Sequence, residues 1–172
     1  MTIRPTRLGE LTTLRAIERA AGRVFAEIGM DAIADDEPIS IDALAEHHRA
    51  GLAWVHVDAS DRAIAYLIAM VLDSCLHVEQ VSVHPDHAGR GIGRGLIEHA
   101  ASAARAARIP ALTLTTFDEV PWNRPYYERL GFRVLRDGQL TPGLVRIRMQ
   151  ERRGGLDRWP RVCMRRDVEP GA

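Results

Sequence analysis

Apolar residues recur along the chain with two different periods, and these periods predict a mixture of helices and strands. From Leu11 to Ile28 the apolar residues lie three or four positions apart, which is the spacing of one face of an α-helix. Gly29 is expected to end this helix. A second helix is expected over residues 40–50, with Ser40 as its N-cap. Residues 30–38 show no period and are expected to form a loop.

β-branched and apolar runs bounded by turn residues predict the strands, and the helical period returns between the later ones. The expected strands are residues 2–7, 52–57, 63–72, 76–83, 111–115, 132–136 and 161–167. The further expected helices are residues 94–108, a short helix within 121–132, and 142–153. This order predicts an antiparallel meander followed by a strand that returns parallel through a helical crossover, as in an α+β protein.

Composition narrows the class of protein. A chain of 172 residues with 46% hydrophobic content can bury a core as one domain, residues 1–172. The 23 basic residues, all of them arginine, balance 23 acidic residues, which argues against nucleic acid or an anionic membrane as a partner. Cys75 and Cys163 are too few for a disulfide framework or a metal site, and we expect both to be buried. Without a leader pattern or a membrane-length apolar run, the protein is expected to be cytoplasmic.

The most informative stretch is a glycine-rich turn that follows the strand over residues 76–83. Its sequence, from His87 to Leu96, places four glycines between a strand and a helix. The first N–H groups of a helix lack internal acceptors and lie at its positive end, so an anion binds there favourably. Arg90 and Arg94 add charge that pairs with phosphate oxygens. A pyrophosphate is the natural ligand, and an ordinary tight turn with two solvated arginines is the alternative.

Three families of glycine turn compete for this stretch. A Walker loop requires a lysine after its last glycine, and the chain contains none. A dinucleotide fingerprint requires an acidic residue about 20 positions on, where this chain has residues 109–112, Ile-Pro-Ala-Leu. Gly91-Ile92-Gly93 instead resembles motif A of the GNAT superfamily of N-acetyltransferases. Ala88 departs from that motif, because the family usually has glutamine or arginine there.

A second motif supports the resemblance. Asn123, Tyr127 and the run Leu130-Gly131-Phe132 match, in order, residues that GNAT enzymes commonly carry about 30 positions after motif A. The resemblance extends from Thr2 to Val168. It implies a single GNAT-type α+β domain with a mixed central sheet of about seven strands flanked by helices.

The resemblance implies acetyl-CoA as co-substrate and assigns residues to it. The pyrophosphate is expected on the turn, and the pantetheine arm beside the preceding strand. The turn residues are Ala88, Gly89, Arg90, Gly91, Ile92, Gly93 and Arg94, and the strand residues are Val81, Ser82 and Val83. Asn123 is expected either to bind the pantetheine arm or to cap its own helix.

The expected chemistry is attack of a primary amine on the thioester. An amine with a pKa of about 10.4 must first lose a proton, and the family position in the strand makes Glu79 the candidate base. A solvated strand glutamate is the alternative for Glu79. Tyr127 is the candidate acid that supplies a proton to the departing thiolate, with a core aromatic as the alternative.

These assignments predict an enzyme that moves an acetyl group from acetyl-CoA to an amine by direct attack in a ternary complex. The acceptor is expected to be a small molecule or a peptide, and no metal is implied. A non-catalytic acyl-CoA-binding or sensor module with the same fold is the alternative, because fold alone does not fix function. GNAT proteins are often dimers, and the sequence leaves a homodimer open.

Overall fold

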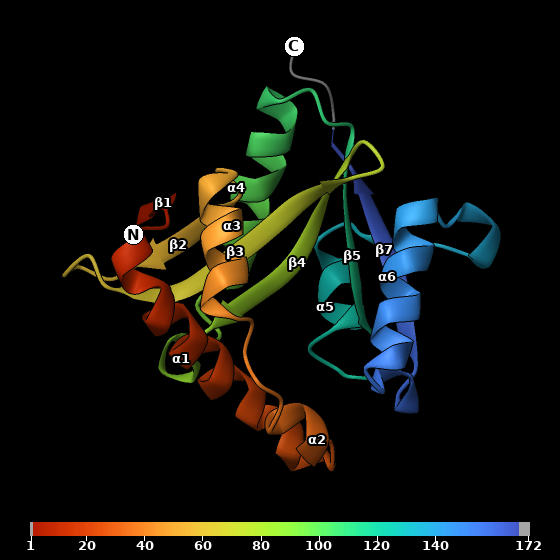
Figure 1. The fold of residues 1–172 in the computed structure, drawn as a ribbon, viewed down its shortest axis with the longest axis horizontal. Coiled ribbons are helices and arrows are strands. Elements are labelled where there is room, and N and C mark those ends of the chain that lie inside the picture. Colours follow the sequence, from red (N-terminus) through yellow and green to blue (C-terminus); the bar gives the residue numbers. More distant parts are fainter. Residues whose placement is uncertain (1, 169–172) are drawn as a thin grey trace. The chain divides into compact units, whose positions relative to one another are not determined.

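The computed structural model describes residues 2–168 and contains a seven-stranded mixed sheet (Figure 1). The strand order is β1-β2-β3-β4-β5-β7-β6. The strands are β1 (Thr2–Pro5), β2 (Ala53–Val57), β3 (Ala63–Leu72), β4 (Cys75–Val83), β5 (Ala111–Phe117), β6 (Arg133–Val134) and β7 (Arg161–Asp167). The α-helices are α1 (Leu11–Gly22), α2 (Asp31–Ala34), α3 (Ile41–Arg49), α4 (Ile92–Ala106), α5 (Arg124–Arg129) and α6 (Pro142–Arg153). The predicted α+β class is therefore confirmed.

Strand pairing follows the predicted topology. β1 pairs with β2 and β2 with β3 in antiparallel register. β4 and β5 are parallel, with Leu76 opposite Leu112 and His77 opposite Thr113. β7 then pairs antiparallel with both β5 and β6. The helical crossover through α4 is what allows the parallel pair, because a tight turn cannot join parallel strands. None of the helices formed by residues 2–168 combines the length and apolar character needed to cross a membrane.

The chain divides into two compact units. The first takes in the chain up to Ala69 together with Gln80–His99. Its core lies where α1 and α3 cover one face of β2 and β3, as Figure 1 shows. Leu14, Leu44 and Val55 are fully buried there. Ser40 caps α3 as predicted, its Oγ accepting a hydrogen bond from the Ala43 N–H at 3.2 Å.

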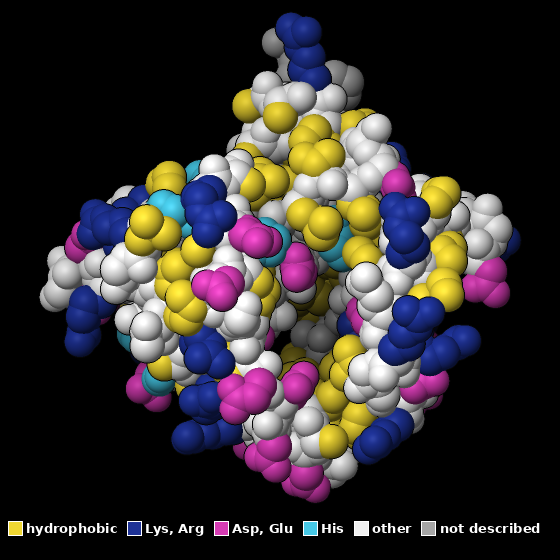
Figure 2. All heavy atoms as spheres, viewed as in Figure 1, with side chains coloured by type: hydrophobic (Ala, Val, Ile, Leu, Met, Phe, Trp, Pro, Cys, Tyr) yellow, Lys and Arg dark blue, Asp and Glu magenta, His cyan; other side chains and the backbone are white. Residues whose placement is uncertain are grey.

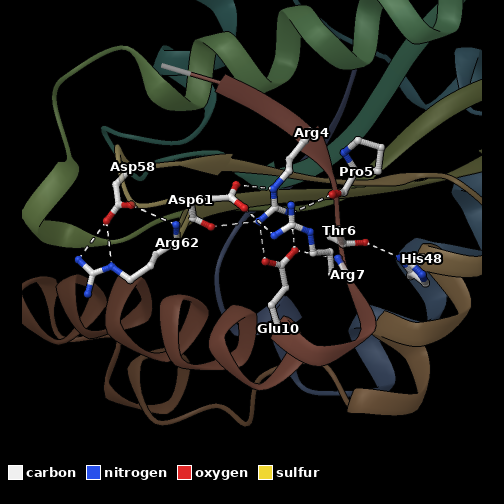
Figure 3. Close-up of polar contacts among 9 residues, drawn as sticks. All are labelled: Arg4, Pro5, Thr6, Arg7, Glu10, His48, Asp58, Asp61 and Arg62. Carbon is white, nitrogen blue, oxygen red and sulfur yellow. Dashed lines mark hydrogen bonds and ion pairs between the residues drawn. The ribbon is translucent and has the colours of Figure 1, made fainter.

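A charged network joins β1 to the β2–β3 hairpin in this unit (Figure 3). The Arg4 guanidinium donates to both oxygens of Glu10, at 2.8 and 3.0 Å, and to Asp61 Oδ1 at 2.9 Å. These bonds raise the pKa of Arg4 above its usual value. Asp61, a hairpin residue, also accepts from Arg7 at 2.6 Å. A charge-assisted bidentate pair fixes geometry as well as charge, so the network sets how the chain enters α1.

The second unit consists of Met70–Glu79 and the chain from Ala100 onward. Its framework is the seven-residue pairing of β5 with β7. In Figure 1, α6 lies in front of β7. A small apolar cluster that includes Leu135, Leu144 and Cys163 connects α6 to the strand. Cys75 and Cys163 are both free and buried, as predicted.

Two local predictions were wrong. The helix expected from Leu11 to Ile28 ends at Gly22 and continues as a 3₁₀ helix, Arg23–Ile28. Glycine is a weak helix former, which accounts for the change at this point. Gly29 then closes the segment with φ +73°, as predicted. The expected loop at residues 30–38 contains the short helix α2, which follows the buried Met30.

The β3–β4 turn holds the start of α6. The Gly143 N–H donates to Asp73 Oδ2 at 2.6 Å, and Thr141 also hydrogen-bonds this carboxylate. These bonds lower the pKa of Asp73. The approach is so close that a Cβ at Gly143 would lie 2.6 Å from Leu72 Cδ1 and would also collide with Asp73 Oδ2. Any larger residue at this position would therefore force the side chains of Leu72 and Asp73 to move.

We expect Gly143→Ala to lower the free energy of unfolding by about 1–3 kcal/mol, because the added methyl group forces Leu72 and Asp73 to move. Urea unfolding measures the change. Gly138→Ala is the matched control, because a Cβ at Gly138 meets nothing within 4 Å. Equal stability of the two variants would contradict the packing explanation.

Candidate active site

The glycine turn adopts the conformation that its sequence predicts. After β4, a 3₁₀ turn (Pro85–His87) leads to Gly89 and Gly91, with φ of +73° and +74°. Left-handed backbone of this kind favours glycine because it has no Cβ. A Cβ at either position would meet nothing within 4 Å, so open space lies beside the turn. The two glycines allow the left-handed backbone of the turn, and no side chain at these positions covers its backbone.

The turn delivers the chain to the start of α4. Ile92 is buried and anchors the first turn of the helix. The Gly95 N–H donates to the Gly91 carbonyl at 2.9 Å. By helix geometry, the N–H groups of Ile92, Gly93 and Arg94 have no acceptor within the helix. These N–H groups form the positive end of the helix dipole, and this end of a helix binds anions favourably.

The two arginines of the turn are exposed. Arg90 donates to the Asp86 carbonyl at 3.1 Å, and this bond closes the turn. Ala88 is also exposed. Ala88 has extended backbone and follows the 3₁₀ turn directly. The turn therefore presents backbone N–H groups and two arginines on one continuous segment.

The last residues of β4 divide between two faces of the strand. Ser82 is buried, and its Oγ accepts a hydrogen bond from Gln80 Nε2 at 2.8 Å. Val81 and Val83 are half-buried. Since strand side chains alternate, the two valines share the face opposite Gln80 and Ser82. The hydroxyl of Ser82 is thus occupied within the chain.

Glu79 and His77 lie two positions apart on β4. Glu79 is exposed, whereas His77 is 2% exposed and its Nδ1 lies 3.0 Å from Thr113 Oγ1. Burial lowers the pKa of His77 to about 4, although the charges of Glu79 and Glu151 oppose the shift. His77 is therefore neutral near pH 7, and no sequence pattern singles it out.

Asn123 does not cap its helix. It occupies the N-cap position of α5, but its side chain makes no capping hydrogen bond, so the capping alternative was wrong. Asn123 Oδ1 instead accepts from Thr116 Oγ1 of β5 at 2.8 Å. Its Nδ2 is buried and has no partner among the described residues. A buried amide donor left unpaired is costly, which indicates a ligand at this position.

Tyr127 lies on α5, one turn after Asn123, whose carbonyl accepts its N–H at 3.0 Å. The ring is half-buried between Tyr126, at 5.3 Å between centroids, and Phe132, at 5.7 Å. Burial, with Tyr126 next to it, raises the pKa of Tyr127 above its usual value. Within residues 2–168 no group hydrogen-bonds the Tyr127 hydroxyl. It is thus a protonated donor without a partner in the chain.

Glu151 of α6 joins a cluster that sequence reasoning missed. It accepts hydrogen bonds from Thr115, from Arg148 and, at 2.8 Å, from Arg161. Burial alone would raise the pKa of Glu151, but the bond from Arg161 and the other contacts hold it below its usual value. Arg161 also lies over the Phe117 ring, 4.4 Å from its centroid. A sequence signal existed, because Glu151 is seven residues after the buried Leu144 and hence on the same helix face.

The site residues predicted from the sequence belong to different units of the structure. The turn, Val81, Ser82 and Val83 belong to the first unit, and Glu79, Asn123 and Tyr127 to the second. Among residues 2–168, no three His, Cys, Asp or Glu side chains are grouped as metal ligands.

Comparison with known proteins agrees with the resemblance seen in the two motifs. The model of the acetyltransferase (GNAT) family matches residues 13–132, which is more than two thirds of the chain. The chain belongs to this family. A curated relative, the peptidyl-lysine N-acetyltransferase YjaB of Escherichia coli K12, is 31% identical over 81 residues. That alignment covers 47% of this chain and 49% of YjaB, and the chain spans about half the length of the curated relatives it matches.

Solved structures confirm the GNAT fold. The ribosomal-protein-S18-alanine N-acetyltransferase of Escherichia coli aligns with a TM-score of 0.68 at 19% identity, over 99% of this chain and 96% of the other. The PaiA N-acetyltransferase of Thermoplasma acidophilum, solved with coenzyme A, aligns with a TM-score of 0.69 at 16% identity, over 96% and 98%. At these identities the likeness shows the fold.

Proposed function

We propose that this GNAT protein transfers an acetyl group from acetyl-CoA to a primary amine by direct attack. The observation that carries the proposal is the glycine turn, where two left-handed glycines leave the start of α4 bare. Its N–H groups suit a pyrophosphate, with Arg90 and Arg94 as added charges. The solved structure of PaiA with coenzyme A supports the same ligand class for this chain.

Residues beyond the turn also fit the coenzyme. The unpaired Nδ2 of Asn123 is a donor suited to an amide carbonyl, and the pantetheine arm carries two such groups. Val81 and Val83 offer an apolar strand face beside which the arm can lie. We therefore assign Asn123 and the end of β4 to the pantetheine arm.

Tyr127 acts on the leaving sulfur in this proposal. When the amine nitrogen bonds to the thioester carbon, the C–S bond breaks and the sulfur takes the electron pair. A tyrosine with a raised pKa remains protonated, so its hydroxyl can donate a hydrogen bond to that sulfur. A thiol pKa of about 8.5 makes complete proton transfer from tyrosine uphill. Hydrogen bonding to the developing thiolate is the main contribution that we assign to Tyr127.

Glu79 receives the proton that the amine loses, directly or through water. At pH 7 the neutral amine is present at roughly one part in a few thousand, equivalent to about 4–5 kcal/mol, so a base is valuable. Glu79 is exposed and can reach an incoming acceptor. His77 is buried and, with a pKa of about 4, is a poor base.

A peptide lysine is one acceptor class for the proposed reaction. YjaB is named as a peptidyl-lysine N-acetyltransferase, which supports this class. Acidic residues gather over α2, at the lower end of Figure 2, and Asp31, Asp35 and Asp36 are exposed there. Such a surface attracts cationic acceptors, including lysine-rich peptides and polyamines.

Calorimetric titration with acetyl-CoA is the first test. We expect the unmodified protein to bind and Gly91→Val to lose binding, because valine is strained at φ +74° and covers the turn. Gly138→Val is the control, since Gly138 is exposed and lies outside the turn. Thiol release is then followed with a lysine peptide and with small amines. Binding without turnover would favour a non-catalytic acyl-CoA-binding module, and absence of binding would overturn the coenzyme assignment.

We expect Tyr127→Phe to lower kcat by about 10²-fold with little change in the affinity for acetyl-CoA, because only the bond to the departing sulfur is lost. Steady-state kinetics and calorimetry separate the two quantities. Tyr126→Phe is the matched control, since it removes the neighbouring hydroxyl. An unchanged kcat in Tyr127→Phe would remove this residue from the chemistry.

We expect Glu79→Gln to lower kcat/KM at neutral pH by about 10²-fold and to recover activity as the pH rises toward the pKa of the amine. The pH–rate profile measures this. Asp137→Asn, which removes another exposed carboxylate of the same unit, is expected to keep the original profile. If Glu79→Gln also keeps the pH–rate profile of the unmodified protein, Glu79 is not the base.

A further inference from the structure

The second unit contains a cavity of about 460 Å³ that the proposed acetyl transfer does not use. It is bounded by α4, by the α5–β6 turn and by the end of β7. Its lining side chains include Arg105, Arg133, Arg165 and Arg166. No residue of the glycine turn is among the described residues that line it.

Basic side chains outnumber acidic ones among the described residues that line this cavity. Asp167 is the single acidic side chain among the described lining residues. It accepts from Arg165 Nε at 2.7 Å and lies 4.0 Å from Arg133 Nη2, so one carboxylate serves two guanidiniums. Arg165 also donates to the Cys75 sulfur at 3.3 Å, a weak acceptor. Among the described lining side chains, four guanidiniums therefore accompany one carboxylate.

The short edge strand β6 explains how the arginines converge. In the described chain β6 pairs only with Met164 and Arg165, whereas β7 continues beside β5 to Asp167. By strand alternation, Arg165 and Asp167 point to one face of the sheet and Arg166 to the other. Because the edge is open beyond Arg165, guanidiniums from both faces line the same cavity. Gly131, with φ +86°, lies next to Arg166, and a Cβ there would make an ordinary contact with Arg166 Cδ at 3.8 Å.

We propose that this cavity binds a phosphate group, either inorganic phosphate or a small phosphate ester. Arginine presents a planar fork of donors that matches phosphate oxygens in pairs. The volume is that of a small-molecule site and is too small for a folded macromolecule. None of its described lining residues belongs to the acyl-CoA site proposed above.

Calorimetric titration with inorganic phosphate and with glycerol 3-phosphate tests the proposal. The titrations are made at matched ionic strength and with coenzyme A at saturation, so that the glycine turn does not contribute. We expect binding with one site per chain. Tighter binding of glycerol 3-phosphate would identify an ester as the ligand, and tighter binding of inorganic phosphate would identify the free anion.

Three variants connect the binding to this cavity. Arg105→Gln with Arg166→Gln is expected to weaken phosphate binding by at least about tenfold, since charge-assisted bonds are lost. Asp167→Asn is expected to tighten it, because the opposing charge is removed. Arg153→Gln, an exposed arginine of α6 outside the cavity, is the control. The proposal would be overturned if the double variant and the control bound phosphate equally well, or if coenzyme A competed with phosphate. It would also be overturned if the unmodified protein did not bind phosphate.

Discussion

The parallel pairing of β4 with β5 is the constraint on which the rest of the structure depends. Parallel strands cannot be joined by a tight turn, so the chain must leave the sheet and return through a helix. That helix is α4, which begins at Ile92, after the 3₁₀ turn and the glycine turn that follow β4. Gly89 and Gly91 make the change of direction possible through left-handed backbone. The bare N-terminus of α4, which we assign to the pyrophosphate, follows directly from this connection.

The second unit contains several polar groups in its interior, and they differ in whether the chain supplies them with hydrogen-bond partners. The carboxylate of Glu151 is fully engaged by Thr115, Arg148 and Arg161. His77 is buried in its neutral form. Asn123 Nδ2 and the Tyr127 hydroxyl, in contrast, lack partners in the described chain. Satisfied groups stabilise and orient, whereas unsatisfied buried groups point to a ligand.

Much of the fold and part of the candidate site could be predicted from the sequence. The hydrophobic pattern located β3, β4 and α3 to within a few residues, and the capping residues Thr141 and Pro142 located α6. The period failed at Gly22, where α1 becomes a 3₁₀ helix, because apolar spacing does not record a weak helix former. Of the two alternatives for Asn123, the helix cap was wrong, because its Oδ1 accepts instead from Thr116, seven residues earlier in the chain. The catalytic and coenzyme assignments remain predictions.

By itself the sequence determined the α+β class, the glycine turn and the family, because periodicity, left-handed glycines and motif spacing are local properties of the chain. Only the tertiary structure decided which polar groups meet. Asp73 holds the start of α6 across 70 residues of sequence. Arg105 and Arg166 line one cavity because β6 is too short to cover the end of β7. Such contacts depend on strand register and edge length, and both are set by packing between segments that are distant in the sequence.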